Sequence, residues 1–458
     1  IPHRVRDGYG VMSYAIQEAA DRDIPLVITV DCGISDVEPI QQGQQMGIEF
    51  IIIDHHLPGP EIPDALVIDP KRPDYDGPDD DLAAVGLAYK FGEAICRMMD
   101  IPVKSLRRAF FDLVAIGTVA DVVPLVGENR LFVKYGLDLL PHTRKPGLQA
   151  LMNLADLNSN LTAQDVGYRL APRLNACGRM ADAADAVDLL LEEDEDVAMK
   201  TALKLEGLNN RRQREQQNTI SSAESLVSQE IDFDQDAVIV LASEDWHAGL
   251  IGIVASRLVE EYYRPTFLMT RQDDTYRGSA RSIEGFHVAD ALQECSDLLE
   301  RHGGHALAGG FTLKMDRLAA FRERLNDIGR RTLLPQDLKP TIHIDAEVAL
   351  AEIDEALVEA LCAMQPFGHS NPEPVFVSRG VELIEVRCVG SEGRHLKLLV
   401  GCGQRVFDCI GFGMGDEAEW IRPGSPVDLV HTPEFNEFNG QTSLQLRLKD
   451  VRRSEAHP

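Results

Sequence analysis

Basic residues are scarce in this sequence of 458 residues, which has 45 Lys and Arg against 74 Asp and Glu and a formal net charge of −29. Such a balance gives little long-range attraction to a phosphate backbone and argues against a protein that coats DNA in general. A local basic lining or bound metal ions can still grip nucleic acid. The composition therefore does not exclude an enzyme that binds nucleic acid in a metal-lined groove.

Cysteine and long apolar runs are also lacking. The eight cysteines include no CxxC pair, which argues against a zinc ribbon or a disulfide scaffold, and we expect Cys32, Cys177 and Cys409 to be reduced in a cytoplasmic protein. No run of eighteen apolar residues, signal peptide or lipidation motif occurs, so we expect no association with a membrane. The length predicts two to four domains.

The first part of the chain alternates between helical and strand patterns. Residues 9–23, 35–47 and 81–99 have helical patterns, residues 24–30, 49–53 and 64–68 form short apolar strand patterns, and residues 105–119 predict another helix that ends at Asp121. This alternation is typical of βαβ units and predicts an α/β domain built on a parallel sheet.

Three further parts follow. Residues 183–230 favour a long charged helix that bridges domains. A second, smaller α/β domain then has strand patterns at 237–243 and 265–270 and helical patterns at 249–263 and 288–302. Beyond about residue 340, five short strand patterns joined by Gly and Asn turns predict a small barrel or sandwich. We therefore expect domains at 1–182, 231–338 and 339–458, with the bridging helix at 183–230.

Polar residues follow two of the first strands where each strand ends. Asp31 follows the strand ITV, and Asp54-His55-His56 follows FIII. Alone, the second cluster is equally consistent with a capped turn and two partly exposed histidines. Parallel strands, however, bring both clusters to one carboxyl edge, where open α/β sheets bind ligands. Asp121 stands in the apolar segment GTVADVVPL. Carboxylates with imidazole suit Mn²⁺ or Mg²⁺ better than structural zinc.

These motifs resemble a known family. The segments DCG, DHH and GTVADVVPL are similar to three of the four motifs of the DHH phosphoesterases. The segments IPHRVRDGYG, LAPRLNACGRM, WHAGLIGIVASRL, GSARSIEGFH, GGHALAGG and QPFGHSNPEPVF resemble its RecJ branch, the exonucleases that digest single-stranded DNA from the 5′ end. The resemblance covers essentially the whole chain in the expected order.

The resemblance implies roles for individual residues. Asp31 would bridge two divalent ions, Mn²⁺ or Mg²⁺, and His55 and Asp121 would ligate one of them. In catalysis, His56 would face the scissile phosphate and Asp54 would orient the site. The implied substrate-binding residues are Arg4, Arg173, Asn175, Arg179, Ser279, Arg281, Gly303, Gly304 and His305.

Several of these substrate contacts have an ordinary structural alternative. GSARSIEG could be a surface hairpin with a solvated Arg281, and His302–His305 could be a plain turn between a helix and a strand. Arg173, Asn175 and Arg179 could stabilise the fold as readily as line a DNA-binding groove between the domains. The C-terminal strands fit an OB-fold, whose aromatics Phe407, Phe412, Trp420, Phe435 and Phe438 could stack on bases, fill a core or dock a partner.

Two departures from the family pattern stand out. His369-Ser370 replaces an expected glycine-containing pair and should affect only a turn. The aspartate-rich first motif, which supplies ligands of the other metal, would lie before residue 1, so we interpret the sequence as starting inside its first domain. We expect residues 1–458 on their own to bind single-stranded DNA weakly without degrading it, and a chain that includes this motif to degrade it with Mn²⁺ or Mg²⁺.

We expect a monomeric nuclease acting on single-stranded DNA in repair and recombination, with a single-strand-binding protein or a helicase as candidate partners. One alternative is a phosphodiesterase of short oligonucleotides or cyclic dinucleotides, although such small substrates need no OB-like module. Another is a catalytically inactive DNA-binding DHH protein, although Asp31, His55, His56 and Asp121 are all retained.

Overall fold

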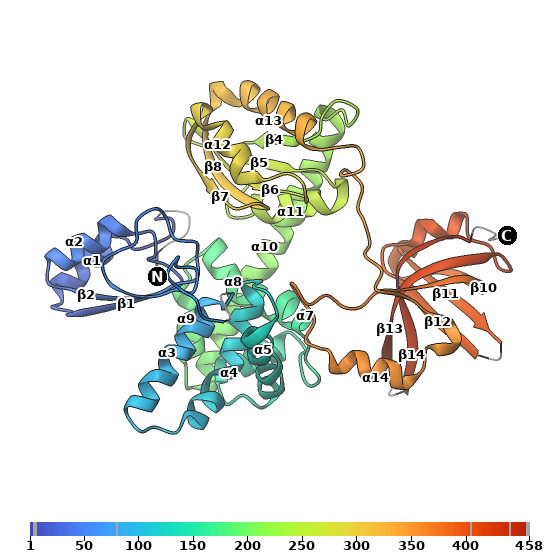
Figure 1. Ribbon diagram of the computed structural model, residues 1–458, viewed down its shortest axis with the longest axis horizontal. Helices are drawn as coiled ribbons and strands as arrows, with labels where there is room; N and C mark the ends of the chain where they lie inside the picture. Colours follow the sequence, from blue (N-terminus) through green and yellow to red (C-terminus); the bar gives the residue numbers. More distant parts are fainter. Residues whose placement is uncertain (3–6, 79–80, 404, 439–440, 455–458) are drawn as a thin grey trace. The chain divides into compact units, whose positions relative to one another are not determined.

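The computed structural model describes residues 1–2, 7–78, 81–403, 405–438 and 441–454 (Figure 1). Arg4 lies outside the described residues. The chain divides into two compact units, one formed by residues 1–121 and 135–340 and the other by residues 122–134 and 341–458. The expected fold class is confirmed: a parallel-sheet domain, a helical region, a second α/β domain and a C-terminal barrel are all present.

A three-stranded parallel sheet with the order β1-β2-β3 opens the first unit. Its apolar strands alternate with helices as the sequence predicts, and the side chains of Ile16, Ile40, Phe50 and Ile52 pack into one core. Because all three strands run in the same direction, their carboxyl ends line one edge. The elements are β1 (Leu26–Val30), β2 (Glu49–Ile53), β3 (Leu66–Ile68), α1 (Ser13–Asp21) and α2 (Val37–Gln45).

A helical region follows this sheet. Helix α4 ends at Ala120, and Asp121 is its C-cap residue, so the backbone exposes that carboxylate where the helix stops. The helices before α10 are α3 (Ala84–Met98), α4 (Val103–Ala120), α5 (Gly127–Leu139), α6 (Pro146–Leu154), α7 (Ala163–Asp165), α8 (Ala171–Met180) and α9 (Ala184–Leu191).

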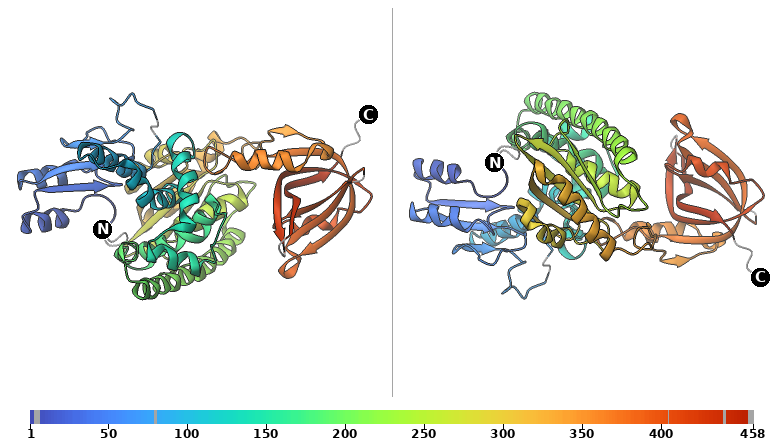
Figure 2. Two further views of the ribbon diagram at one scale, coloured as in Figure 1. Left: turned by 90° about the horizontal axis from the view of Figure 1, so that it is seen from below. Right: turned by 90° about the horizontal axis from the view of Figure 1, so that it is seen from above.

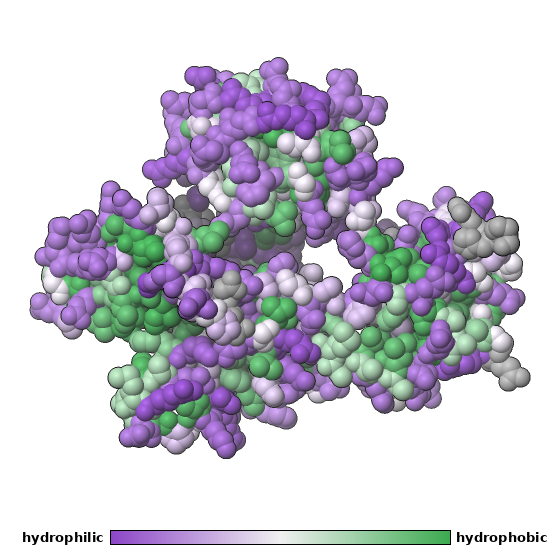
Figure 3. All heavy atoms as spheres, in the orientation of Figure 1, coloured by the Kyte–Doolittle hydropathy of each residue, from purple (hydrophilic) through white to green (hydrophobic). Residues whose placement is uncertain are grey.

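The long helix α10 (Glu195–Glu230), green in Figure 2, begins later than the expected residue 183. Asp194 caps it, because its Oδ1 accepts hydrogen bonds of 2.9 Å from the backbone N–H groups of Asp196 and Val197. Its last turns pack Ile220, Ala223 and Val227 against the second α/β domain. None of the described helices is long and apolar enough to cross a membrane. Hydrophilic side chains cover much of the face of the molecule that Figure 3 shows.

The second α/β domain has a five-stranded sheet with the order β4-β5-β6-β8-β7. Part of one prediction was wrong here, because residues 299–302 of the expected helix 288–302 form strand β7. They favour a helix locally, but pairing with β8 satisfies their backbone groups at the sheet edge. The elements are β4 (Ile239–Ser243), α11 (Ile251–Tyr262), β5 (Thr266–Gln272), β6 (Thr275–Arg281), α12 (Val288–Glu294), β7 (Leu299–Gly304), β8 (Ala308–Lys314) and α13 (Leu318–Thr332).

The second unit contains a closed five-stranded barrel. Strands β10, β11, β12, β14 and β13 pair in that order, and β13 pairs again with β10. The prediction of an OB-like barrel is thus confirmed. Ser370 has a φ of 57° in the turn between Gly368 and Asn371, which explains why a glycine is expected there. The elements are β9 (Ala346–Glu347), α14 (Glu355–Ala363), β10 (Phe376–Val389), β11 (His395–Cys402), β12 (Arg405–Gly411), β13 (Pro426–Phe438) and β14 (Gln441–Arg453).

The aromatic side chains of the barrel differ in how deeply they are buried. Phe407 is buried in the barrel core, whereas Phe412 is exposed and lies edge-on against His395 with 5.4 Å between ring centroids. Trp420 is partly buried beneath the guanidinium of Arg453. Phe435 is 37% exposed, and the side chain of Phe438 is outside the described part of the chain. Phe407 is therefore a core residue, whereas Phe412 is open to solvent.

A buried histidine in the barrel should make this unit sensitive to acid. His431 is fully buried, and burial lowers its pKa to about 4. Ser378 donates its single hydroxyl proton to Val348 O, so the Nε2–H of His431 must be the donor to Ser378 Oγ, 2.9 Å away. The other ring nitrogen, Nδ1, has no hydrogen-bond partner among the described residues. A second proton there would be buried without an acceptor.

We therefore expect the barrel to lose stability as the pH falls from about 6.5 toward 4. The unfolded histidine binds a proton in this window and the folded one does not, so the free energy of unfolding should drop by on the order of 2 kcal/mol between pH 7 and pH 5. Trp420 fluorescence in a Trp246→Phe background, followed through urea unfolding, measures this. The same loss in a His431→Gln variant would assign the acid sensitivity to other groups.

Candidate metal centre

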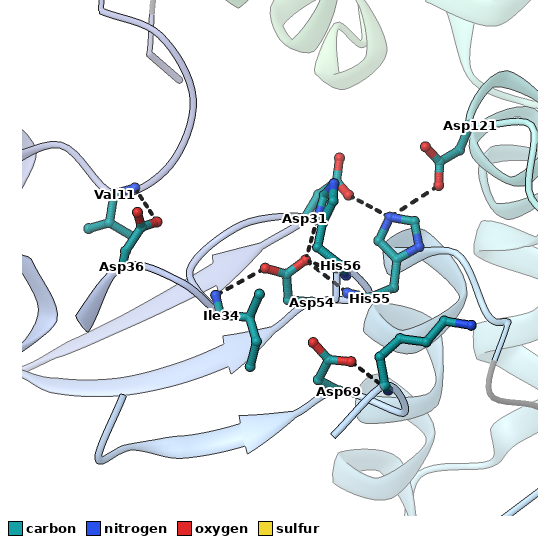
Figure 4. A network of polar contacts seen from close by, with 10 residues as sticks. Val11, Asp31, Ile34, Asp36, Asp54, His55, His56, Asp69 and Asp121 are labelled. Atoms are coloured by element: carbon teal, nitrogen blue, oxygen red, sulfur yellow. Dashed lines mark hydrogen bonds and ion pairs between the residues drawn. The ribbon is translucent and has the colours of Figure 1, made fainter. Parts of the chain in front are cut away.

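Three aspartates follow the three parallel strands at the same edge (Figure 4). Asp31 comes directly after β1, Asp54 after β2 and Asp69 after β3. The sheet continues one hydrogen bond past its strands, because Asp31 N donates to Ile53 O at 2.9 Å and Asp54 N donates to Ile68 O at 3.1 Å. The backbone of Asp31 then turns into the left-handed region, with φ of 66°. Asp and Asn tolerate this conformation better than most residues.

The side chain of His55 lies between two carboxylates from distant parts of the sequence. Its Nε2 atom is 3.2 Å from Asp31 Oδ1 and 3.3 Å from Asp121 Oδ2, as Figure 4 shows. These contacts are close enough for ion pairs, yet the buried Nε2 makes no well-directed hydrogen bond within the described part of the chain. The predicted ligands Asp31, His55 and Asp121 are therefore brought together by the fold.

This arrangement fits a divalent cation. Burial alone would lower the pKa of His55, but the carboxylates of Asp31 and Asp121 raise it above its ordinary value. Burial raises the pKa of Asp121. A cation among these atoms would neutralise both carboxylates and would give His55 Nε2 the partner that it lacks. The side chain of Asp31 is 57% exposed, which leaves that carboxylate open to solvent.

Asp54 occupies a different position from the other two aspartates. It is only 1% exposed, and its Oδ1 accepts hydrogen bonds from His55 N at 2.8 Å and from His56 N at 3.2 Å. Its Oδ2 accepts from Ile34 N at 3.1 Å. Burial alone would raise the pKa of Asp54, but the hydrogen bonds from the His56 ring and from these backbone groups lower it below its ordinary value. Asp54 is therefore ionised and holds the backbone of His55 and the ring of His56 in place.

His56 is held by that carboxylate. Its Nδ1 lies 2.7 Å from Asp54 Oδ1, and this contact raises the pKa of His56. Because Asp54 is ionised, Nδ1 carries the proton of this hydrogen bond, and Nε2 is left for a ligand. Donor atoms of Asp31, His55 and His56 also lie within 4.8 Å of one another. His56 therefore lies beside the predicted metal ligands Asp31 and His55 with one ring nitrogen available.

Asp69 was missed by the sequence analysis. It is buried, its Oδ1 accepts from Lys71 N at 2.7 Å, and its Oδ2 has no hydrogen-bond partner among the described residues. Burial raises the pKa of Asp69 to about 6, helped by the nearby charge of Asp54. The signal was the same one that identified Asp31 and Asp54: an Asp directly after an apolar strand pattern, in the segment DALVID.

The residues expected from PRLNACGRM lie on α8 and do not form one group. Arg173 makes an ion pair with Glu206 of α10, with 2.5 Å between Nε and Oε2, which supports its structural alternative. Asn175 is exposed. Arg179 donates from a terminal nitrogen to Gly249 O at 3.2 Å and thus ties α8 to the segment before α11.

Ser279 and Arg281 form a second group, on strand β6. A terminal nitrogen of Arg281 lies 3.2 Å from Ser279 Oγ, and the same nitrogen donates to Ala280 O at 2.8 Å. Gly252 of α11 packs against both side chains, since a Cβ there would lie 2.9 Å from Ser279 Oγ. Gly303 and Gly304 end strand β7, and His305 begins the tight turn to β8. This places the GGH segment at a hairpin end within the sheet.

Comparison with known proteins agrees with this architecture. The DHH family N-terminal domain matches residues 4–118, the DHHA1 domain matches residues 235–330, and the RecJ OB domain matches residues 344–450. The single-stranded-DNA-specific exonuclease RecJ of Bacillus subtilis is 38% identical over 99% of this chain and 57% of the relative. The RecJ of Salmonella typhimurium is 34% identical, over 98% of this chain and 81% of that protein. The chain belongs to the RecJ family.

A solved RecJ structure has the same fold. The crystal structure of RecJ in complex with Mn²⁺ from Thermus thermophilus superposes with a TM-score of 0.85 at 31% identity, over 97% of this chain and 64% of that one. The chain thus spans less than two thirds of the length of this RecJ and of the Bacillus subtilis relative. A RecJ structure from the same organism in complex with Mg²⁺ has a TM-score of 0.76.

Proposed function

We propose that this protein is a metal-dependent exonuclease that hydrolyses the phosphodiester bonds of single-stranded DNA from the 5′ end. The observation that carries the proposal is the buried Nε2 of His55, which lies between the carboxylates of Asp31 and Asp121 without a hydrogen-bond partner among the described residues. The RecJ relatives are named single-stranded-DNA-specific exonucleases, which supports the same activity here.

We infer that Asp31, His55 and Asp121 would hold one divalent cation, Mn²⁺ or Mg²⁺, and that Asp31 would also contribute to a second. When bound, such cations lower the pKa of a water molecule and offset the negative charge on the phosphate during in-line displacement. No nucleophile from the protein is needed in this chemistry. The carboxylates of Asp31 and Asp121 supply the negative charge that attracts the cations, and His55 supplies a neutral nitrogen.

The Asp54–His56 pair has a separate task. Asp54 fixes the orientation of the His56 ring and raises its pKa, which favours the protonated form of the ring. A protonated Nε2 beside the cation ligands is placed to donate a hydrogen bond to a phosphate oxygen, where negative charge develops in the transition state. We infer that His56 contacts the substrate and that Asp54 acts through it.

The second domain would bind the 5′ end of the DNA. Ser279 offers a short hydroxyl donor, and Arg281 offers a planar guanidinium that matches phosphate oxygens. Gly303 and Gly304 expose backbone at the end of strand β7, which lies beyond β8 in the same sheet. We propose that the OB-like barrel binds single-stranded DNA or docks a single-strand-binding protein or helicase. We further propose that the protein acts as a cytoplasmic monomer in DNA repair and recombination.

A digestion assay tests the proposed activity. The protein is expected to release mononucleotides from a 3′-labelled single-stranded oligonucleotide with Mn²⁺, and to release none with EDTA or from a blunt duplex. Progressive shortening from the 5′ end supports the proposal. Hydrolysis restricted to dinucleotides or cyclic dinucleotides would support a small-substrate phosphodiesterase instead, and DNA binding without hydrolysis would support an inactive DNA-binding protein.

Arg281→Ala should weaken the preference for a 5′-phosphorylated end. Loss of one charged phosphate contact should lower kcat/KM on a 5′-phosphate substrate by about tenfold or more and leave a 5′-hydroxyl substrate nearly unchanged, because the lost contact is local. Competition between the two substrates in one reaction measures the ratio. An equal loss on both ends would assign Arg281 to general binding, and Arg330→Ala on α13 is the matched control.

A further inference from the structure

The boundary between the two units of the chain falls directly after a predicted metal ligand. Asp121 ends the first stretch of one unit, and residues 122–134 belong to the other unit. The chain returns to the first unit at Tyr135. We call residues 122–134 the strap. A single peptide bond therefore joins Asp121 to a segment that packs within the second unit.

The link between Asp121 and the rest of the strap is stiff. Three residues, VVP, separate Asp121 from Leu125. Both valines are β-branched, the proline ring fixes its own φ, and a proline also restricts the residue before it. Val122 holds a φ of 59°, which β-branched residues rarely adopt, although 67% of this residue is exposed. A displacement of Leu125 is therefore passed on to the backbone of Asp121 instead of being absorbed by the link.

Residues 364–371, which we call the clamp, overlap the segment QPFGHSNPEPVF and hold the strap at Leu125. Leu125 N donates a hydrogen bond of 2.8 Å to His369 O. The side chain of Leu125 is buried and packs on Gly368, where a Cβ would lie 2.6 Å from Leu125 Cδ1. Because Gly368 has no positive φ, the close approach of Leu125 is what requires a glycine there.

Arg130 attaches the strap to the clamp at a second point. One of its terminal nitrogens donates to Met364 O at 2.8 Å and to Gln365 O at 3.2 Å. Asn371 braces the clamp from inside, because its Nδ2 donates to Pro366 O at 2.8 Å. Groups of the second unit thus hold the strap at two places, and the proposed function gives the clamp no other task.

We propose that the clamp positions the metal ligand Asp121 through the strap. Asp121 is the C-cap of α4, so the direction of its carboxylate depends on where the chain goes next. With the strap held, Asp121 Oδ2 lies 3.3 Å from His55 Nε2 (Figure 4). With the strap released, the stiff link would carry the carboxylate away from the cation. Arg130 and Gly368 are then positioning residues, and the inference rests on the proposed function, which assigns Asp121 to the metal.

Arg130→Ala is expected to weaken Mn²⁺ binding by about tenfold, the lower end of the effect of removing a group that orients a metal ligand. Electron paramagnetic resonance of free Mn²⁺ during titration of the metal-free protein measures this affinity. Arg422→Ala is the matched control, because a terminal nitrogen of Arg422 also donates to two carbonyls of the second unit, Ala418 O at 3.1 Å and Ile421 O at 2.8 Å. The control should bind Mn²⁺ normally, and normal binding by Arg130→Ala as well would overturn the proposal.

An Asp121→Ala background shows whether the effect passes through this ligand. Arg130→Ala should not weaken Mn²⁺ binding further in that background, because a carboxylate that is absent cannot be misplaced. An equal loss in both backgrounds would mean that Arg130 supports the fold in general, and the assignment of a positioning role would be wrong.

Gly368→Ala tests the clamp from its other side. The new Cβ pushes against Leu125 and displaces the strap, so Mn²⁺ affinity should fall about as much as in Arg130→Ala. Gly207→Ala on α10 is the control, since a Cβ there would meet nothing within 4 Å. Full Mn²⁺ affinity in Gly368→Ala would contradict the proposal.

Hydrogen exchange of the metal-free protein tests the clamp without the cation. The amide of Leu125, which donates to His369 O, should exchange about tenfold faster in Arg130→Ala and in Gly368→Ala, and at its normal rate in Arg422→Ala. Normal exchange in both clamp variants would overturn the inference. If the unaltered protein bound no Mn²⁺ at all, the proposed function would fail, whereas the exchange rates would still decide whether the clamp holds the strap.

Discussion

Asp31→Asn and His55→Gln are each expected to reduce Mn²⁺-dependent hydrolysis of single-stranded DNA by on the order of a thousandfold or more, equivalent to about 4 kcal/mol of transition-state stabilisation. Each substitution removes a ligand atom from the group in which His55 Nε2 lies 3.2 Å from Asp31 Oδ1 and 3.3 Å from Asp121 Oδ2. Asparagine is the right replacement at position 31, since it tolerates the φ of 66° that would strain alanine. Single-turnover digestion measures the loss.

Two matched control variants distinguish a loss of catalysis from a loss of folding. Asp23→Asn replaces another aspartate at positive φ, 52°, near the same sheet, and His142→Gln replaces an exposed histidine in the same unit. Both should retain full activity, and all four variants should keep the thermal unfolding profile of the unaltered protein. Hydrolysis by either site variant at more than about a tenth of the normal rate would contradict the assignment of these residues to the metal.

Asp54→Ala is expected to damage both stability and activity. Asp54 is buried and accepts hydrogen bonds from Ile34 N, His55 N and the His56 ring, so its removal leaves buried donors without an acceptor. The expected loss is about 2 to 4 kcal/mol in the free energy of unfolding, with a fall in kcat of on the order of a hundredfold. Urea unfolding and single-turnover digestion measure the two effects.

Asp54→Asn separates the two roles of this carboxylate. Its similar size should preserve the packing, and its remaining oxygen can still accept from the His55 and His56 groups, but its NH₂ group would face the Ile34 N–H, so part of the stability should be lost. Loss of the negative charge should lower the pKa of His56, which Asp54 raises in the native site. NMR titration of the His56 ring measures this change, which a purely structural role would not produce. A His56 pKa that did not fall in Asp54→Asn would contradict the assignment of Asp54 as the group that holds the proton on His56.

The part of the site formed by strand ends could be predicted from the sequence. Apolar runs followed by Asp31 and by the Asp54-His55-His56 triplet identify parallel strands that end at one edge, and the fold brings these groups together. The approach of Asp121 depends on the length and packing of α3 and α4, which the sequence alone does not give. Asp121 entered the prediction as a lone carboxylate in the apolar segment GTVADVVPL, and the resemblance of this segment to a family motif then implied its role as a ligand.

Long-range pairing accounts for the predictions that fell short. Residues 299–302 favour a helix locally but pair with β8, and the backbone hydrogen bonds of a sheet edge outweigh that local preference. Arg173 was a candidate for the DNA groove, yet it makes an ion pair with Glu206, 33 residues away. Asp69 was available to the same reasoning that found Asp54, since it follows the strand pattern LVI, but its burial could be known only from the structure.

The most direct test of the metal centre is anomalous diffraction at the manganese edge from crystals of the protein grown with MnCl₂. We predict a strong anomalous peak within about 2.5 Å of His55 Nε2 and of carboxylate oxygens from Asp31 and Asp121, the range of ordinary divalent cation coordination. The peak should disappear or weaken severely in Asp31→Asn crystals and persist in Asp23→Asn crystals. Well-diffracting crystals with millimolar Mn²⁺ and no anomalous density at these three side chains would contradict the account.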